Sequence, residues 1–465
     1  MNSAQALNPS ILREYDIRGI VGETLTAPNV GDIGKAFGTL LVEKAGPSPC
    51  VVVGYDGRLS SPDLSDALCQ GLASTGVNVI NIGVGPTPML YFATYHLETA
   101  AGLMITGSHN PPEFNGIKMM LQGHSFFGNA IQDLGARVAA GQFHQGKGEI
   151  KSADVSGAYI NRLLECLGRA TLDLRVAWDP GNGASGDIVR RLTSQLGGDH
   201  ILLNEEIDGT FPNHHPDPTV EDNLEQLKTV VRQQGCDLGI GLDGDGDRIG
   251  VVDSQGRVLW GDQLMVVWAR DVLLRHPGAT IIADVKTSQV FYNEVEKAGG
   301  TPLMWKTGHS LIKSKMFEMK SPLAGEMSGH IFFADEYYGF DDAVYAALRL
   351  LRVLALSEQS IDDIKDQLRE MHNTPELRFE CPDEKKFQIA EDVRQRLAKE
   401  KDVTVHTMDG VRVETKDGWW LLRASNTQPV LVARCESDTQ RGLQRLKDAL
   451  ATQLHASGVA PPDFG

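Results

Sequence analysis

Three aspartates alternate with glycines in the segment LDGDGDR: Asp243, Asp245 and Asp247. In an extended backbone alternate residues face the same side, so the three carboxylates converge. Converging carboxylates repel one another unless a cation lies among them, and Mg²⁺ and Ca²⁺ prefer oxygen ligands. An EF-hand opens with a similar alternation, but here its sixth position holds Arg248 and its twelfth Ser254. The segment therefore predicts a divalent-cation site of another kind, and a surface turn is the alternative.

Ser108 lies in a stiff loop, ITGSHNPPEFNGIK, that follows the apolar run AAGLMIT. Two prolines fix φ there and remove backbone donors, whereas two glycines permit backbone shapes that other residues resist. A serine in such a turn can be a nucleophile, although many ordinary turns look alike. Three aspartates leave Mg²⁺ short of six ligands, and a phosphoryl group on Ser108 would supply another oxygen. Arg248 and Lys118 could then balance the charge during phosphoryl transfer.

Glu326, Ser328 and His330 occur together in the loop GEMSGH. A carboxylate and a hydroxyl match a pair of neighbouring sugar hydroxyls, one as acceptor and one as donor. The sequence leaves open whether this loop binds a sugar or is a polar turn that closes a strand. His309, in KTGHS, is a candidate acid or base, although a lone histidine is more often structural.

A further polar loop, RASNTQP, follows the apolar run GWWLL. A guanidinium with hydroxyl and amide donors can cradle a phosphate, and an ordinary turn rich in Ser and Thr is the alternative. The candidates are Arg423, Ser425, Asn426 and Thr427. Three other polar residues are functional candidates or members of structural ion pairs: Tyr15, Arg18 and Lys286.

The elements that must position these loops follow one pattern three times. The runs CVVVGYDGR, LRVAWDPGNG and ATIIADVKTS are each β-rich up to an aspartate: Asp56, Asp179 and Asp284. An amphipathic helical segment, a second strand, further helix and a third strand follow each run. This alternation predicts an α/β fold with three similar βαβαβ units and largely parallel sheets. Right-handed crossovers would place the loops TGSHNPP, DGDGDR and GEMSGH at equivalent sheet edges, where ligands bind.

We expect four domains, and each is named by the function predicted for its loop. The boundaries fall near the stretch GQFHQGKGEIKSADVSG, near the turn VVDSQGRVLWG, and where the pattern turns polar after Ala355. The tail alternates helix and strands and reads as a smaller α+β domain. The expected domains are 1–152 (phosphoserine), 153–257 (metal), 258–369 (sugar) and 370–465 (phosphate).

Composition restricts the class of partner. The chain has 44 basic and 61 acidic residues, a net charge of −17, which argues against nucleic acid as the main partner. A small anion could still bind a locally basic pocket. Six scattered cysteines without a CxxC pair are typical of buried free thiols. The sequence shows neither a secretory signal nor an apolar run of about 20 residues, so we expect a cytoplasmic protein without a membrane partner.

The loops TGSHNPP, DGDGDR, GEMSGH and RASNTQP resemble the four signature loops of the α-D-phosphohexomutase family, in its order and across essentially the whole chain. GEMSGH and KTGHSLIK are similar to the bacterial phosphomannomutase/phosphoglucomutase branch. The resemblance implies four domains around a central cleft. It also implies an isomerase that moves a phosphoryl group between the 1- and 6-hydroxyls of mannose and glucose phosphates. A phosphoserine and a hexose 1,6-bisphosphate, which is both intermediate and activator, would carry the reaction.

The resemblance further implies a role for each site residue. The ligands of one Mg²⁺ would be Ser108, Asp243, Asp245 and Asp247. The catalytic residues would be Ser108, Lys118, His309, Arg18 and Arg248, with Lys118 and His309 both candidates for the acid or base. The substrate would contact Tyr15, Arg18, Lys286, His309, Glu326, Met327, Ser328, Gly329, His330, Arg423, Ala424, Ser425, Asn426 and Thr427.

Two alternatives remain at this stage: a metal-dependent sugar phosphatase, and a non-catalytic sugar-phosphate sensor. Hydrolysis needs neither a sugar-gripping loop nor a separate phosphate cradle, and a sensor needs no nucleophile. Because the bisphosphate intermediate must reverse its orientation within the cleft without being lost, we expect the tail domain to close over it as a lid. The expected partners are hexose phosphates, and the sequence leaves the oligomeric state open, a monomer included.

Overall fold

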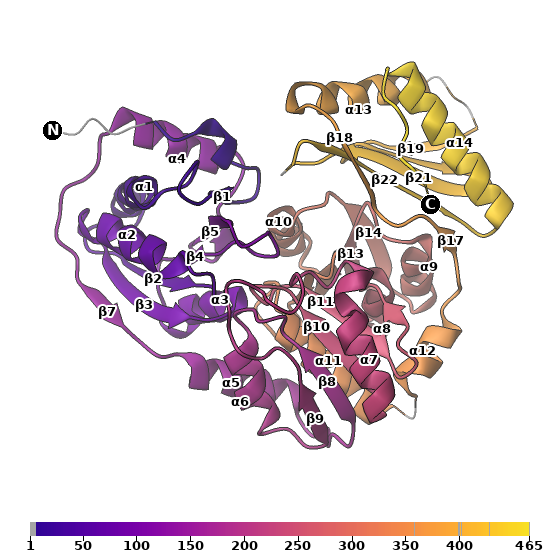
Figure 1. Ribbon diagram of the computed structural model, residues 1–465, viewed down its shortest axis with the longest axis horizontal. Helices are drawn as coiled ribbons and strands as arrows, with labels where there is room; N and C mark the ends of the chain where they lie inside the picture. The colour runs from indigo at the N-terminus through magenta and orange to yellow at the C-terminus, as the bar shows by residue number, and fades with distance from the viewer. Residues whose placement is uncertain (1–5, 358, 399, 401, 427, 465) are drawn as a thin grey trace.

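The computed structural model describes residues 6–464 except 358, 399, 401 and 427 (Figure 1). The first unit begins with a 3₁₀ turn at Pro9–Ile11. Its further elements are β1 (Ile17–Ile20), α1 (Ala27–Ala45), β2 (Cys50–Tyr55), α2 (Ser61–Ala73), β3 (Asn78–Val84), α3 (Thr87–His96), β4 (Ala101–Ile105), β5 (Phe114–Leu121), β6 (His124–Ser125), α4 (Asn129–Ala140) and β7 (Ile150–Ser152). Their sheet has the order β1-β5-β4-β2-β3-β7, and β6 pairs with β5.

The second and third units follow the same plan. The second contains α5 (Ser156–Leu164), β8 (Arg175–Asp179), α6 (Gly186–Thr193), β9 (Asp199–Leu202), α7 (Glu225–Gln234), β10 (Leu238–Leu242), β11 (Ile249–Asp253) and β12 (Val258–Leu259), with 3₁₀ turns at Glu165–Leu167 and Glu221–Leu224. The third contains α8 (Gly261–Arg275), β13 (Thr280–Asp284), α9 (Gln289–Lys297), β14 (Thr301–Trp305), α10 (His309–Met319), β15 (Leu323–Gly325), β16 (Ile331–Phe333), α11 (Ala343–Leu356) and α12 (Ile361–Gln367).

The three sheets share one strand arrangement, and the prediction of three similar βαβαβ units is confirmed. In each unit the first strand of the βαβαβ pattern, β2, β8 or β13, is central and pairs in parallel with the second and the third. An antiparallel strand then joins the third one: β5 beside β4, β11 beside β10, and β16 beside β15. The three chemistry-bearing loops are therefore equivalent hairpin connections at the carboxyl ends of the third parallel strands.

The tail is a separate α+β layer at the end of the chain (Figure 1). It contains β17 (His372–Asn373), β18 (Leu377–Glu380), α13 (Asp383–Leu397), β19 (Thr404–His406), β20 (Val411–Thr415), β21 (Gly418–Ala424), β22 (Val430–Ser437) and α14 (Gln440–Ala456). All pairings in its sheet are antiparallel. The loop RASNTQP connects β21 to β22, so it is again a hairpin connection.

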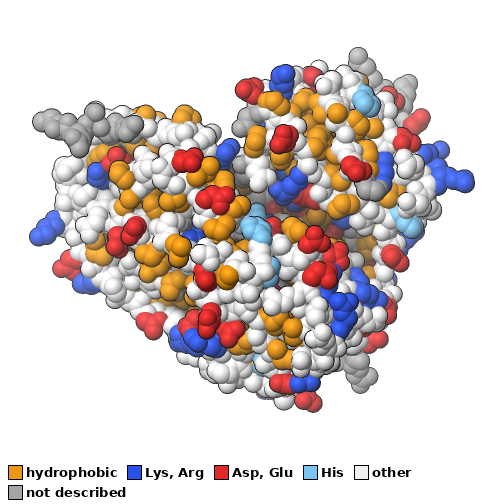
Figure 2. Space-filling view, viewed as in Figure 1, with side chains coloured by type: hydrophobic (Ala, Val, Ile, Leu, Met, Phe, Trp, Pro, Cys, Tyr) orange, Lys and Arg blue, Asp and Glu red, His pale blue; other side chains and the backbone are white. Residues whose placement is uncertain are grey.

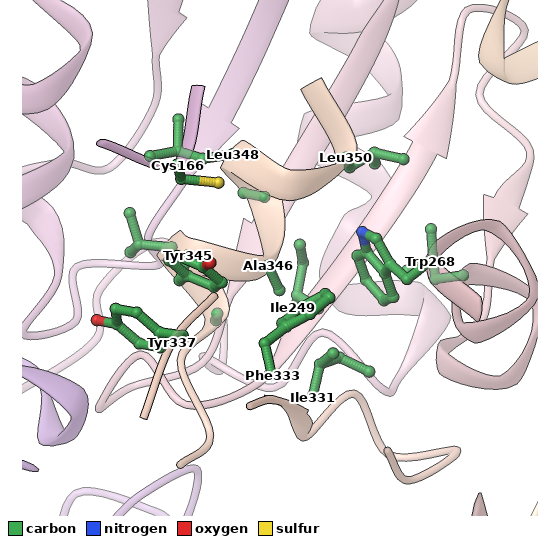
Figure 3. Close-up of a cluster of buried hydrophobic side chains, with 14 of the residues drawn as sticks. Cys166, Ile249, Trp268, Ile331, Phe333, Tyr337, Tyr345, Ala346, Leu348 and Leu350 are labelled. Carbon is green, nitrogen blue, oxygen red and sulfur yellow. The ribbon is translucent and has the colours of Figure 1, made fainter. Parts of the chain in front are cut away.

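One large apolar core extends through parts of the first three units, the first unit has a further core of its own, and the tail has another. Helix α11 packs against α5, β10 and β11 of the second unit, so the second and third units are held together. Figure 3 shows Tyr345, Ala346 and Leu348 of this helix among side chains that include Ile249 and Phe333. Ala and Leu favour helix, and a helix apolar on nearly every face must be buried. The first three units therefore form one body.

The tail core lies between its sheet and helices α13 and α14, and includes Trp420, Leu422 and Leu450. In the described residues the apolar contact between the tail and the third unit is a small cluster, Val285 with Trp419 and Leu421, and the polar contact includes buried hydrogen bonds from Arg412 to the third unit's backbone. Interfaces between domains that are small and largely polar permit relative motion.

Two expectations from composition can be compared with the fold. Five of the six cysteines are buried, as expected of structural thiols. Within the described residues, none of the helices has both the length and the apolar character needed to cross a membrane.

Candidate active site

Ser108 is buried in the loop between β4 and β5, with its backbone in the left-handed region at φ 51°. Its N–H donates to Thr106 Oγ1 at 2.8 Å. Its Oγ lies 3.4 Å from Asp243 Oδ2 and 3.2 Å from His109 Nδ1. A non-glycine residue in this conformation is strained unless its surroundings hold it, and such strain clusters at functional sites.

Arg58 holds this loop from beneath. Its guanidinium donates to the carbonyl oxygens of Ser108, Asn110, Pro111 and Phe114 at 2.5–3.0 Å, and to Asp56 Oδ2 at 3.1 Å. The same carboxylate oxygen accepts from Gly107 N at 2.9 Å. A Cβ on Gly107 would lie 2.1 Å from Arg58 Nε, so glycine is required for this close approach. Arg58 was not predicted from the sequence. Its one indication there was its position shortly after Asp56, the aspartate at which the first β-rich run ends.

The three aspartates of the second unit converge as predicted, and all three are fully buried. One oxygen from each of them lies within 4.8 Å of the others. Asp245 Oδ1 and Asp247 Oδ1 are buried without a hydrogen-bond partner in the described structure. Burial and the neighbouring carboxylates raise the pKa of Asp243 well above its usual range. A hard divalent cation binds oxygen ligands, and two of these buried carboxylate oxygens have no hydrogen-bond partner. The three aspartates therefore fit a hard divalent cation.

Lys118 on β5 lies beside these carboxylates. Its Nζ is 2.7 Å from Asp245 Oδ2 and also pairs with Asp247 Oδ2. Burial alone would lower the pKa of Lys118, but the two carboxylates outweigh burial and raise the pKa well above its usual range. Lys118 therefore carries a positive charge at the junction between the first and second units.

Asp341 links two histidines behind the metal loop. Its Oδ2 lies 3.1 Å from His330 Nδ1 and 3.7 Å from His309 Nδ1, and the two rings stack with centroids 5.5 Å apart. Arg248 Nε donates to His330 Nε2 at 3.0 Å. Burial lowers the pKa of His309 well below its usual value, so its imidazole is neutral near pH 7. A neutral imidazole can accept a proton.

The sugar-loop candidates are fixed by the third unit. Glu326 Oε1 accepts from Gly308 N at 2.6 Å, and burial raises the pKa of its carboxyl group. Asp284 Oδ1 accepts from Met327 N at 3.2 Å, much as Asp56 holds the serine loop. The Met327 side chain contacts Arg434 of the tail, and neither Met327 nor Gly329 lines the central cavity.

The tail reaches the cavity through the loop after β21. Arg423 Nε pairs with Asp409 Oδ2 at 3.0 Å, and the same oxygen accepts from Thr307 N at 3.0 Å. Asn426 Nδ2 donates to Tyr15 OH at 2.6 Å, and Tyr15 OH donates to Thr307 O at 2.7 Å. Tyr15 therefore connects the first unit, the third unit and the tail. Ala424 does not line the cavity, and Thr427 lies outside the described residues.

A cavity of about 140 Å³ brings most of the predicted residues together. It is lined by Tyr15, Arg18, Ser108, Lys118, Arg248, Lys286, His309, Glu326, Ser328, His330, Arg423, Ser425 and Asn426, among others. Figure 2 shows the hollow between the first unit and the tail, with basic side chains on its walls. Lys286 Nζ pairs with Glu376 at 2.8 Å and Arg18 pairs with Asp16.

Several cations around one small cavity favour an anionic ligand. The site also holds a buried serine beside an acidic cluster that could hold a metal ion, and polar groups suited to sugar hydroxyls. These features are those of an enzyme that handles phosphorylated sugars.

Comparison with known families identifies the chain. Models of the phosphoglucomutase/phosphomannomutase family match its α/β/α domain I at residues 9–145, domain II at 157–256, domain III at 260–371 and the C-terminal domain at 376–453. The chain belongs to the phosphoglucomutase/phosphomannomutase family, and the resemblance to the α-D-phosphohexomutases is confirmed.

Relatives agree over nearly the whole length. The chain is 43% identical to a phosphomannomutase/phosphoglucomutase of Pseudomonas aeruginosa, with 99% of each chain covered. It is 41% identical to a phosphoglucomutase of Neisseria gonorrhoeae, covering 97% of this chain and 98% of that one. A crystal structure of a phosphoglucomutase/phosphomannomutase family protein from Burkholderia thailandensis is 40% identical and superposes with a TM-score of 0.91, covering 98% and 100% of the two chains. The predictions of fold class and of an isomerase are confirmed.

Proposed function

We propose that the chain is a hexose phosphate mutase that interconverts the 1- and 6-phosphates of mannose and of glucose through a phosphoserine. The observation that carries this proposal is one cavity that holds Ser108 beside the aspartate cluster, the sugar loop and the phosphate cradle. A phosphatase would need no second binding mode for the product, and a sensor would need no buried serine held in a strained backbone.

We propose that Asp243, Asp245, Asp247 and an oxygen of phosphorylated Ser108 hold one Mg²⁺. The unpartnered buried oxygens of Asp245 and Asp247 support this donor set. Such an ion, when bound, polarises the phosphorus and neutralises charge on the transferring group. Lys118 and Arg248, which approach from the first and second units, add fixed positive charge beside the same group.

The first half-reaction transfers the phosphoryl group of Ser108 to the free hydroxyl of a hexose monophosphate. The bond between phosphorus and Ser108 Oγ breaks, and a bond between phosphorus and the sugar oxygen forms. The sugar hydroxyl gives its proton to His309, and Ser108 Oγ takes a proton from Lys118, the other acid or base candidate, as it leaves. The product is a hexose 1,6-bisphosphate, which must then present its other phosphate to Ser108.

The second half-reaction is the same chemistry in reverse, with the sugar turned end for end. We propose that Arg423, Ser425, Asn426 and Thr427, with Lys286, Tyr15 and Arg18 nearby, hold the phosphate that does not react. A cradle built from flexible cations and amide or hydroxyl donors can accept either phosphate. Arg423 and Asn426 reach the cavity from the tail, whereas Ser108 reaches it from the first unit.

Sugar specificity follows from which hydroxyls are bound. We propose that Glu326 and Ser328 bind the 3- and 4-hydroxyls, which glucose and mannose share. Carbon 2, where these sugars differ, is then weakly recognised. Both sugars should turn over with kcat/KM values that differ by less than about 10³, or roughly 4 kcal/mol. A larger preference would contradict this assignment.

Phosphorus NMR tests the function directly. Purified protein is incubated with glucose 1-phosphate, Mg²⁺ and trace glucose 1,6-bisphosphate, and then with mannose 1-phosphate. Growth of the 6-phosphate signal without inorganic phosphate identifies a mutase, whereas accumulating phosphate identifies a phosphatase. Ser108→Ala should abolish turnover, and Ser194→Ala, at an exposed position, should not. An unchanged spectrum with both sugars would overturn the proposal.

We propose, on the same footing, the domain division 1–152, 153–257, 258–369 and 370–465. The separate sheets of the four parts and the tail's own core support it. We also propose a cytoplasmic location, which the scattered cysteines without a CxxC pair support.

A further inference from the structure

A second cavity, of about 770 Å³, lies between the first and third units, away from Ser108. Its walls come from α3 and the β5–β6 hairpin on one side, and from α10 and residues 334–340 on the other. Figure 1 draws α10 beside β5, and α10 contacts β6. Its volume lies within the range of about 300–1,000 Å³ that is common for small-molecule sites. Neither the predicted site residues nor the mutase reaction accounts for it.

The walls of this cavity are rich in aromatic rings. Tyr338 stacks on Tyr95 with centroids 4.7 Å apart, and on Phe340 at 5.6 Å. Phe317 on α10 is 72% exposed, and its ring meets His124 edge-to-face at 4.9 Å. Flat aromatic walls with an exposed ring at the rim suit a planar aromatic ligand, because offset stacking adds to the burial of apolar area.

The charge that remains at this cavity is positive. Its two acidic residues are already paired, Glu318 with Lys315 and Asp335 with Arg275 and Arg349. Lys320 and His276 also line it and make no ion pair in the part of the chain that the structure describes. On a protein of net charge −17, a locally basic cavity favours an anion.

We propose that this cavity is a second binding site, for an aromatic ring that carries a phosphate, the chemical class of a nucleoside 5′-monophosphate. The ring would stack among Tyr95, Tyr338 and Phe317. The phosphate would lie toward Lys320 and Lys313, which also lines the cavity.

Lys313 joins this cavity to the candidate active site. Its Nζ lies 4.5 Å from the centroid of the Tyr91 ring, which also lines the cavity, and donates to Asp341 Oδ1 at 2.8 Å. Asp341 Oδ2 is in turn 3.1 Å from His330 Nδ1. A phosphate that draws Lys313 toward the cavity removes a cation from the carboxylate that holds the histidines. Ligand binding should therefore lower kcat with little change in KM, a consequence that rests on the proposed function.

Calorimetry with adenosine 5′-monophosphate as the probe tests binding by itself. The full-length protein is first saturated with glucose 1-phosphate, so that the candidate active site is blocked. We expect saturable binding that is at least tenfold weaker with adenosine, which lacks the phosphate, and with inorganic phosphate, which lacks the ring. The Phe317→Ala/Lys320→Glu variant should bind the probe at least tenfold more weakly.

A matched variant controls for the loss of an exposed ring and of a surface charge. Phe387→Ala/Lys416→Glu makes the same two changes in the tail, where Phe387 is 56% exposed, and should bind like the unmodified protein. Absence of binding, loss of binding under saturating glucose 1-phosphate, or equal binding by both double variants would overturn the second site. Binding with an unchanged kcat would overturn only the link through Lys313, and phosphorus NMR judges the mutase reaction separately.

Discussion

The guanidinium of Arg58 holds the Ser108 loop in its conformation. Four backbone carbonyls and one carboxylate accept its N–H groups, and the side chain is fully buried. These bonds fix the carbonyl oxygens of the strained serine and of three residues that follow it. Hydrogen bonds to a charged group contribute about 1.5–3 kcal/mol each, so the loop conformation depends on this residue.

Replacing Arg58 with lysine should disorder the serine loop while keeping the positive charge. Lysine has three donors on one nitrogen and cannot reproduce the planar fork. We expect kcat to fall by about 10²-fold, equal to about 2.7 kcal/mol, with a smaller change in KM. Intact-mass measurement after incubation with glucose 1,6-bisphosphate should show slower phosphorylation of Ser108.

Arg137→Lys is the control, because Arg137 makes a two-bond pair with Glu43 on the surface. Such exposed pairs contribute about 0–1 kcal/mol. Equal kinetics for Arg58→Lys and Arg137→Lys would show that Arg58 does not position the serine.

Most of the candidate site could be predicted from residue types, because Ser108, the aspartates and Glu326 belong to short loops whose spacing carries the chemistry. Arg58 and Asp341 could not, because their importance depends on tertiary contacts. Arg58 contacts residues some 50 positions away, and Asp341 lies beside histidines on two other segments. Local spacing does not reveal these contacts.

At the level of elements, α11 begins at a buried carboxylate that joins the second and third units. Asp342 accepts from Tyr345 N at 2.9 Å as the helix cap, and from Tyr159 OH and Tyr337 OH at 2.8 and 2.9 Å. Burial raises its pKa to about 6, from an ordinary value of 3.8. The folded protein therefore binds this proton more tightly than the unfolded chain does.

The contribution of Asp342 to stability is fully present below pH 4 and is lost as the pH rises through 6. A shift of about 2 pKa units corresponds to at most about 3 kcal/mol. In Asp342→Asn, the amide can still cap the helix and stays neutral. The melting temperature of this variant minus that of the unmodified protein should therefore rise between pH 4.5 and 7.

Calorimetric scans at several pH values measure this difference. The exposed Asp66→Asn change on α2 serves as the control. The melting temperature of this variant minus that of the unmodified protein should change less with pH. A flat difference for Asp342→Asn would contradict the proposed protonation of the cap.

The order of elements could be predicted because each unit repeats an aspartate-ended strand and amphipathic helices. The prediction missed β7, which lies in a stretch rich in Gly and Lys that was expected to be a boundary. This strand is exposed and short, and pairs only at the edge of the first sheet beside β3. A polar edge strand is held in the sheet mainly by backbone hydrogen bonds. Its sequence therefore shows little alternation of apolar and polar residues.

At the scale of the whole molecule, the separate core of the tail and the small central cavity both bear on how substrate enters the site. The cavity of about 140 Å³ is small beside the range of about 300–1,000 Å³ for ligand sites. The bonds of Tyr15 to Asn426 and Thr307, all of which line the cavity, connect three parts of the chain. A sugar phosphate must therefore enter when the tail is open, and the bisphosphate must be retained when it is closed.

We therefore predict that the tail closes over bound ligand and that Tyr15 holds it closed. Solution scattering should show the radius of gyration, about 23 Å for a compact chain of this length, decreasing when hexose phosphate is added. Tyr15→Phe removes the hydroxyl that joins Asn426 to Thr307. Released 1,6-bisphosphate per turnover should then increase, and the reaction should depend more strongly on added bisphosphate.

Asn426→Ala breaks the same connection, so the double variant should release no more intermediate than either single variant. Additive release would mean that the two side chains act separately, for example through direct contacts with the sugar phosphate. Scattering that shows no compaction would contradict the closing of the tail, because the bisphosphate would then reverse its orientation in a cleft of fixed width. Retention by closure and retention by direct contacts thus predict different results for the same three variants.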